Sequence, residues 1–191
     1  MTGGNENHPV KGSKIKVDPI MDLEAIGAIK TMLKGKLMHL ALFTVGINTN
    51  LRASDLIKLT VGQVKDVLPM GDVELREQKT GKIRRVTLNN ACVEAIQYLL
   101  GVIPMNDEDR IFPLTVPSVH RLVKGWCRKV GLKGNYGSHT LRKTFGYQQR
   151  VTFGVGLPEL MRCFNHASQG QTLDYICIQP EEIKNVYANE I

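Results

Sequence analysis

Apolar positions recur at helical spacing along most of this 191-residue chain, and the period changes in only one region. Between residues 19 and 34 they fall on one side of a helix, and Asp18-Pro19 supplies a cap and a first-turn proline. A second helix over residues 36–47 is expected to be more deeply buried. The same kind of signal predicts further helices from Leu51 onward and over residues 90–101, 118–130, 139–150, 157–165, 171–177 and 180–188.

The period changes after residue 71. The segments "DVELREQ" and "IRRVTL" contain β-branched residues in partial alternation, and "KTGK", with Gly81 in the turn, separates them. This pattern predicts a hairpin, so the expected fold class is α+β: a mostly α-helical domain with a small antiparallel sheet. Residues 1–17 are polar and glycine-rich and are expected to form a flexible N-terminal arm, which leaves residues 18–191 as one domain.

The charge of the chain indicates which class of partner it could bind. The chain has 25 Lys and Arg against 18 acidic residues, a formal net charge of +7, and no acidic residue between Arg110 and Pro158. Trp126, Tyr136 and Tyr147 are interleaved with the cations of this stretch. A merely solvated basic surface is the alternative, but cations interleaved with aromatic residues favour a face that binds nucleic acid.

Several other classes of protein find no support. Cys163 and His166 are the only close pair of potential zinc ligands, and the basic half has no acidic pair to hold the ions of a two-metal nuclease. "GDVELREQKTGK" lacks the first glycine of a P-loop, and no G-x-S-x-G sequence occurs. The four cysteines form no C-x-x-C pair, which favours a reduced, cytoplasmic protein, and the longest apolar run, of eleven residues, predicts no membrane span.

What remains is a series of cationic and neutral side chains at intervals along the chain. They are Arg52 in "NLRASDL", Lys79 in "EQKTGK", His139 and Arg142 in "SHTLRKTF", His166 in "CFNHAS" and Tyr175 in "TLDYICI". Each has an ordinary structural explanation when taken alone. Arg52 could pair with Asp55, Lys79 could solubilise a turn, His139 could pack at a helix start capped by Ser138, and Tyr175 could belong to the core.

Taken together and in this order, the segments resemble the tyrosine recombinase (phage integrase) family. "GINTNLRASDLIKLTVGQV" is similar to the family's segment around its first arginine, with Asp55 where an acidic residue usually follows. "QKTGKIRRVTL" resembles its hairpin, "HTLRKTFG" matches its H-x-L-R, and "CFNHASQGQTLDY" places a histidine and a tyrosine nine residues apart. The resemblance covers roughly residues 19–180. Asn165 departs from the glycine that usually precedes the histidine, so the local turn is expected to differ.

The resemblance implies a fold, the catalytic domain of these recombinases, and a role for each residue. Arg52 and Arg142 would clamp the scissile phosphate, with Asp55 supporting the first of them, and their charge would favour the phenolate of the nucleophile Tyr175. His139 would orient or accept the phenol proton, and His166 would hold a non-bridging oxygen. Lys79, on a mobile hairpin, would protonate the leaving 5′ oxygen.

The resemblance also implies double-stranded DNA as the partner, with no metal and no cofactor. The cations expected to contact DNA are Arg121, Lys124, Arg128, Lys129, Lys133 and Lys143. The chain is expected to be largely monomeric when free and to self-associate on DNA, in a synapse of four protomers.

The family's usual N-terminal core-binding domain has no counterpart in this sequence, so an excised catalytic domain and a naturally short recombinase both stay open. Two other functions also stay open. One is relaxation of DNA in the manner of a type IB topoisomerase, and the other is DNA binding without catalysis. A test for a covalent protein–DNA adduct separates the catalytic readings from the last one.

Overall fold

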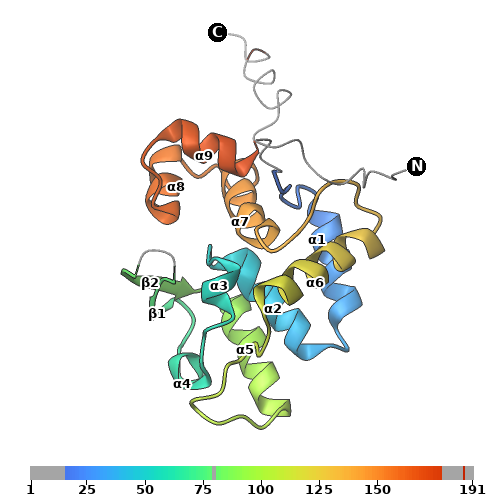
Figure 1. Cartoon of the computed structure of the whole chain (residues 1–191), viewed down its shortest axis with the longest axis vertical. Coiled ribbons are helices and arrows are strands. Elements are labelled where there is room, and N and C mark those ends of the chain that lie inside the picture. Colours follow the sequence, from blue (N-terminus) through green and yellow to red (C-terminus); the bar gives the residue numbers. More distant parts are fainter. Residues whose placement is uncertain (1–15, 79–80, 178–186, 188–191) are drawn as a thin grey trace, which may run out of the picture.

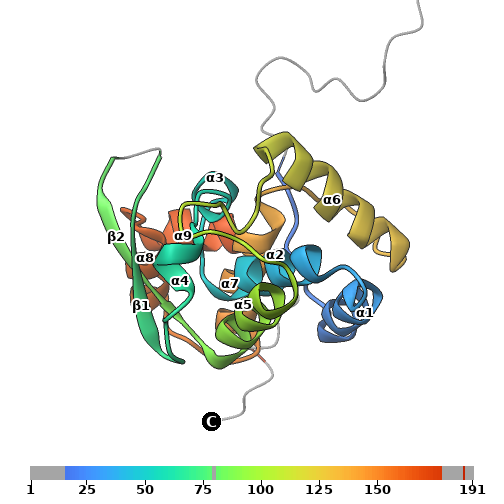
Figure 2. The same cartoon turned by 90° about the horizontal axis from the view of Figure 1, so that it is seen from below.

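The computed structural model describes residues 16–78, 81–177 and Tyr187. Helices surround a central helix, and a two-stranded sheet lies at one side (Figures 1 and 2). In chain order the elements are α1 (Leu23–Leu33), α2 (Leu37–Asn48), α3 (Ala53–Leu56), α4 (Val61–Val64), β1 (Gly71–Arg76), β2 (Ile83–Leu88), α5 (Asn90–Val102), α6 (Val116–Lys129), α7 (Thr140–Val151), α8 (Leu157–Phe164) and α9 (Gln169–Ile176). The predicted fold class, mostly helical with a small antiparallel sheet, is confirmed.

Helix α2 is the centre of the main core. Every residue from Ala41 to Gly46 is buried, because α1, α5 and α7 pack around this helix. A helix that is apolar on all sides is stable only when it is covered in this way. Among the described residues, no helix has the length and apolar character needed to cross a lipid bilayer.

The hairpin forms where the alternation predicted it. Strands β1 and β2 pair antiparallel, with Gly71 opposite Leu88 and Arg76 opposite Ile83. Val73 and Leu75 of β1 and Val86 of β2 face the core, as the period of two requires. Between the strands, Gly81 adopts a positive φ of 67°, a conformation that glycine reaches without strain.

The first helix begins later than predicted. Asp22, not Asp18, caps α1, by accepting a 2.8 Å hydrogen bond from the backbone N–H of Glu24. Asp18 instead exchanges hydrogen bonds with Asn135: its N–H donates to the Asn135 carbonyl at 2.7 Å, and its Oδ2 accepts from the Asn135 N–H at 2.8 Å. These long-range bonds hold the segment before α1 extended, and local sequence cannot reveal them.

Other helices also have boundaries that differ from the predicted ones. The helix predicted near Leu51 is shorter than expected, since α3 ends at Leu56, and the short helix α4, which follows a β-bridge between Thr60 and Arg110, was not predicted. Helix α9 starts at Gln169, since the Ser168 hydroxyl caps it by accepting from the Gln171 N–H at 3.2 Å. Residues 1–15 of the predicted arm lie outside the described residues, as does the predicted helix over 180–188 apart from Tyr187.

A smaller apolar cluster joins α7, α8 and α9. Leu160 and Phe164 of α8 and Ile176 of α9 are buried in it. Gly146 of α7 makes this contact close, because a Cβ at that position would lie 2.5 Å from Phe164 Cζ and 2.7 Å from Ile176 Cγ2. Helices α8 and α9 therefore approach the backbone of α7 directly.

We predict that Gly146→Ala destabilises the protein. The new methyl group overpacks the cluster, and overpacking costs about 1–3 kcal/mol, more than the roughly 1 kcal/mol that alanine adds to helix propensity. Thermal unfolding should show a melting temperature lower by several degrees. The matched control is Gly27→Ala in α1, where nothing lies within 4 Å of the added Cβ and a small gain in stability is expected. Equal gains in both variants would contradict close packing at Gly146.

Candidate active site

The structure brings four of the predicted site residues together from different parts of the chain. Arg142 lies on α7, Arg52 caps α3, His166 follows α8, and Tyr175 lies on α9. The Tyr175 ring centroid is 5.9 Å from the Arg142 guanidinium carbon and 5.3 Å from the His166 ring centroid. His139 is exposed at the N-cap position of α7, three residues before Arg142.

The Arg142 guanidinium is buried, with only 3% of the residue exposed. One terminal nitrogen donates to the carbonyl of Asn50 at 2.8 Å and the other to the carbonyl of Phe164 at 3.1 Å. Burial lowers the pKa of Arg142 to about 10, although the tyrosine beside it acts in the opposite direction. The group therefore stays charged at neutral pH, and its position is fixed by two backbone carbonyls from distant segments.

Arg52 is held by two acids. Its guanidinium lies 3.0 Å from Glu77 Oε2 and 3.8 Å from Asp55 Oδ2, and 20% of its side chain is exposed. The Asp55 side chain is fully buried and also accepts a 2.9 Å hydrogen bond from the backbone N–H of Gln78. The Arg52–Asp55 proximity that the sequence suggested is therefore present, and Glu77 makes the closer contact.

Tyr175 lies against Phe164, with ring centroids 5.1 Å apart. Burial raises the pKa of the Tyr175 phenol above its usual value, although Arg142 and Arg52 both act to lower it. Both guanidiniums therefore favour the phenolate, as predicted from the sequence, but the net pKa of the phenol is still raised in the DNA-free protein. Each cation acts in the expected direction, but loss of solvent outweighs them.

His166 lies directly after a tight helix end. Backbone N–H groups of Asn165 and His166 close α8 by donating to the carbonyls of Arg162 and Met161. Asn165 has φ 56° and ψ 48°, which is the left-handed conformation. Glycine adopts this conformation most readily, and asparagine tolerates it better than most other residues do. The departure from the family's glycine therefore leaves a left-handed turn in place.

The His166 ring is oriented on both sides. It stacks on Phe164 with centroids 5.1 Å apart and an interplanar angle of 16°, and its Nδ1 lies 3.1 Å from the Thr172 hydroxyl. Burial, together with Arg142 and Arg52, lowers the pKa of His166 below its usual value. The imidazole is consequently neutral at pH 7 in the free protein.

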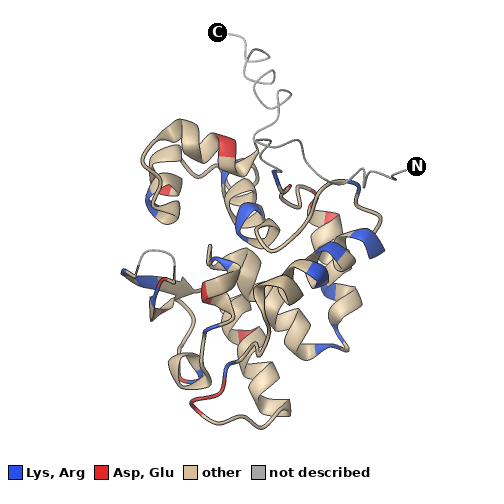
Figure 3. Cartoon of the chain, viewed as in Figure 1, with Lys and Arg blue, Asp and Glu red and all other residues tan. Residues whose placement is uncertain are grey.

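The basic stretch divides into exposed and buried parts. Figure 3 shows Lys and Arg positions along α6. Most of the predicted DNA-contacting cations lie on this helix or just after it and are exposed: they are Arg121, Lys124, Arg128, Lys129 and Lys133. Lys143 contradicts the prediction, because only 6% of it is exposed and its Nζ lies 3.1 Å from Cys177 Sγ and 5.2 Å from the Tyr175 ring centroid. It belongs to the interior beside the tyrosine.

The interleaved aromatic residues are also buried. Trp126, Tyr136 and Tyr147 each have less than a tenth of their surface exposed, and Phe43 packs edge-on against Trp126. None of the three is available to stack on a base. Trp126 alternates with cations because α6 has one buried face and one exposed face, whereas Tyr147 lies on α7, most of which is buried.

Lys79 lies outside the described residues, but the residues around it are tied to the site. Besides the bond from Gln78 to Asp55, the Gly81 N–H donates to the Glu77 carbonyl at 2.9 Å, and Arg76 donates to the Gly81 carbonyl at 2.8 Å. The residues on either side of Lys79 are thus bonded to Asp55 and to the backbone of Glu77, the two acidic residues that hold Arg52.

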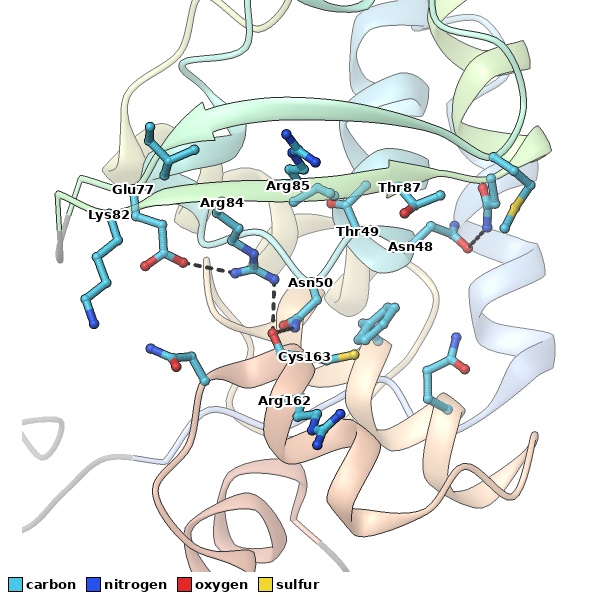
Figure 4. A pocket seen from close by; sticks show the side chains of 17 residues that line it. Asn48, Thr49, Asn50, Glu77, Lys82, Arg84, Arg85, Thr87, Arg162 and Cys163 are labelled. Carbon is cyan, nitrogen blue, oxygen red and sulfur yellow. Dashed lines mark hydrogen bonds and ion pairs between the residues drawn. The ribbon is translucent and has the colours of Figure 1, made fainter.

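Three residues that were not predicted from the sequence, Glu77, Arg84 and Asn50, line a hollow of about 570 Å³ between the hairpin and helices α7 and α8 (Figure 4). The sequence did contain a signal for Glu77 and Arg84. Glu77 continues the inward-facing series after Val73 and Leu75, and charged residues at inward positions need partners. Asn50 gave no such signal, because its positive φ of 53° and its bonds depend on the folded chain.

We predict that the Tyr175 phenol ionises only above pH 10 in the DNA-free protein. Ultraviolet titration of wild type minus Tyr175→Phe isolates this group. Because the folded pKa is raised, the stability that this group contributes is fully present below about pH 10, the unfolded pKa, and is lost as pH rises through the folded pKa. Wild type should therefore lose stability relative to Tyr175→Phe in that window. A midpoint below pH 10 would mean that the cations dominate.

Comparison with known proteins agrees with the predicted family. The model of the phage integrase family matches residues 21–182. The chain is 33% identical over 182 residues to "Probable integrase/recombinase YoeC" of Bacillus subtilis (strain 168). The aligned region covers 90% of this chain and 95% of YoeC.

Two solved structures share the fold. The structure of XerA recombinase has a TM-score of 0.74 and 19% identity, over 93% of this chain and 66% of XerA. The post-cleavage complex of the XerH site-specific recombinase with palindromic difH substrate has a TM-score of 0.73 and 16% identity, over 93% of this chain and 53% of XerH. The family match and the YoeC similarity together show that this chain belongs to the phage integrase family of tyrosine recombinases.

Proposed function

We propose that this chain is a site-specific DNA recombinase that cleaves and rejoins DNA through a 3′-phosphotyrosine at Tyr175. The observation that carries the proposal is the packing of the Tyr175 phenol against Arg142 and His166, with Arg52 acting on the same groups. Membership of the phage integrase family supports it. The XerH complex, whose fold this chain shares, contains cleaved recombination-site DNA and is consistent with the same partner here.

The two arginines account for activation of the phosphate. A phosphodiester gains negative charge as the nucleophile adds, and guanidiniums present planar pairs of N–H donors that match phosphate oxygens. In our proposal Arg142 supplies a fixed, buried positive charge beside the phosphate. Arg52, which is partly exposed, exchanges a contact with Glu77 for one with the phosphate. His166 contributes a ring nitrogen to a non-bridging oxygen.

Protons move in two places in the proposed reaction. The neutral Tyr175 phenol loses its proton as its oxygen bonds to phosphorus, with His139 orienting the phenol or accepting that proton, and the bond from phosphorus to the 5′ oxygen breaks. Lys79 gives a proton to that leaving oxygen. Arrival of the phosphate brings a negative charge that offsets the cations, so it raises the pKa of His166 and strengthens donation from the ring to a non-bridging oxygen.

The covalent intermediate conserves the energy of the phosphodiester bond. A 5′-hydroxyl from a second duplex attacks the phosphotyrosine, Tyr175 recovers its proton, and a new DNA strand is sealed without ATP. Exchange of both strands of two duplexes needs four cleavages. Since each chain supplies one nucleophile, we propose that four protomers assemble on DNA from a largely monomeric free protein.

The cations on α6 and after it are proposed to contact the DNA backbone. They are exposed, and no acidic residue lies among them in the sequence. This proposal assigns Arg121, Lys124, Arg128, Lys129 and Lys133 to phosphate contacts and removes Lys143, which is buried.

We predict that Tyr175→Phe abolishes cleavage and leaves DNA affinity within a few fold of wild type. The substitution keeps the ring that packs on Phe164 and removes only the nucleophilic oxygen. Capture of the protein on a nicked suicide duplex, read on a denaturing gel, measures the adduct. Tyr98→Phe is the matched control, because Tyr98 is exposed on α5 and should not alter the adduct yield. An adduct formed by Tyr175→Phe would assign the nucleophile to another residue.

We predict that the double variant Lys124→Gln, Arg128→Gln weakens DNA binding and reduces its dependence on salt. Each lost phosphate contact should lower the slope of log K against log salt concentration by about 0.9. Titrations at several salt concentrations measure the slope. Lys34→Gln, a neutralisation at an exposed position outside the basic stretch, serves as the control. An unchanged slope in the double variant would remove α6 from the interface.

A further inference from the structure

Lys143 places a second buried cation beside Tyr175. It follows Arg142 on α7, and only 6% of the residue is exposed. Its Nζ lies 5.2 Å from the centroid of the Tyr175 ring and donates to Cys177 Sγ at 3.1 Å. The Arg142 guanidinium carbon lies 5.9 Å from the same ring centroid. Two consecutive residues of α7 therefore bring positive charge close to the proposed nucleophile.

The contact with Cys177 lies at the end of helix α9, which packs beside α7 (Figure 1). Cys177 directly follows this eight-residue helix in a left-handed conformation, with φ 58° and ψ 46°. So short a helix depends on tertiary contacts for its position. Lys143 supplies one of these contacts two residues after Tyr175, so it ties the end of α9 to the helix that carries Arg142.

A contribution to folding does not explain an ammonium at this position. Burial of a charge costs free energy unless strong acceptors replace the lost solvent, and a thiol is only a weak acceptor. An apolar side chain of similar length would fill the same space without that cost. The face of an aromatic ring does attract a cation, and the attraction is larger where water is excluded. The charge of Lys143 is therefore best explained by its contact with the Tyr175 ring.

A second lysine contacts the same helix at the surface. Lys16 Nζ lies 3.9 Å from Asp174 Oδ1, and the two side chains are 59% and 82% exposed. An exposed pair of this kind contributes little, because solvent screens the charges and both side chains lose freedom. Lys16 and Lys143 thus approach α9 at adjacent residues, one at the surface and one in the interior, and provide a matched comparison.

We propose that Lys143 is a positioning residue for the nucleophile Tyr175. Its ammonium holds the phenol ring through the cation–π contact and the end of α9 through Cys177. The phenol oxygen therefore keeps its place relative to the phosphate that Arg142 binds. Lys143 does not touch the phosphate and acts only through the tyrosine. This inference rests on the proposed function, in which Tyr175 attacks the scissile phosphate.

The test measures covalent adduct formation by Lys143→Met in single-turnover experiments with the full chain and excess nicked suicide duplex. Methionine keeps an unbranched side chain of similar length and removes the charge. We expect the rate constant of adduct formation to fall on the order of 10²-fold, as it does when a reacting group is misplaced by about 1 Å. DNA affinity and the slope of log K against log salt concentration should match wild type, because a buried lysine displaces no counterion from DNA.

The final yield of adduct separates a positioning role from a folding defect. Unfolded protein forms no adduct and lowers the yield, whereas a misplaced tyrosine lowers the rate constant at full yield. We expect Lys143→Met to reach the wild-type yield and to melt no lower than wild type, because an apolar group in place of a buried charge is often neutral or stabilising. A lower yield at an unchanged rate constant would assign Lys143 to folding alone.

Further variants locate the effect. Lys143→Arg should recover part of the lost rate, because a guanidinium also binds the face of an aromatic ring. Cys177→Ala should slow the reaction less than Lys143→Met does, since it leaves the ring contact in place. The double variant should be no slower than Lys143→Met alone, as is expected when two residues act through one contact. Lys16→Met should stay within about twofold of wild type, because its ion pair is exposed.

The outcomes distinguish failure of this inference from failure of the proposed function. If wild type forms the adduct at Tyr175 and Lys143→Met forms it at the same rate, the positioning role is wrong and the proposed function stands. A smaller salt slope in Lys143→Met would reveal a phosphate contact and would also overturn the positioning role. If wild type forms no adduct, or Tyr175→Phe still forms one, the nucleophile is misassigned, and the inference fails together with the proposed function.

Discussion

The buried guanidinium of Arg142 is the interaction on which the rest of this site depends. A charge that is removed from water is tolerated only where oxygen acceptors replace the lost solvent, and here the carbonyls of Asn50 and Phe164 do so. These two carbonyls belong to the α2–α3 connection and to the end of α8. By satisfying one cation they join segments more than 100 residues apart and set the place where Tyr175 and His166 must pack.

The same burial decides the protonation states of the free protein. Loss of solvent raises the pKa of Tyr175 and lowers that of His166, so both are neutral at pH 7 while Arg142 remains charged. The site therefore carries positive charge without a pre-formed nucleophile. In the proposed reaction the phenol loses its proton only when a phosphate is present, which limits attack to bound DNA.

Acidic residues organise the more exposed half of the site. Asp55 and Glu77 hold Arg52, and Asp55 also binds the backbone of Gln78. The two carboxylates neutralise part of the charge of Arg52 in the free protein and fix the hairpin beside it. A phosphate that replaces one of these contacts exchanges one anion for another, so Arg52 can change partners without being left buried and unpaired.

The sequence by itself determined the elements, the family and the site's residue types. The change of period from helix to alternation located the hairpin, and the H-x-L-R and the nine-residue histidine–tyrosine spacing identified the family, because these features are local. Tertiary structure decided the rest. Asp18 binds Asn135 instead of capping a helix, Lys143 is buried, and the aromatic residues of the basic stretch are core. The contacts made by Glu77, Arg84 and Asn50 likewise depend on carbonyls and cations that are distant in sequence. Charges and spacings can be read from a chain, but which of two opposing effects prevails, desolvation or attraction, depends on what the folded protein places around each group.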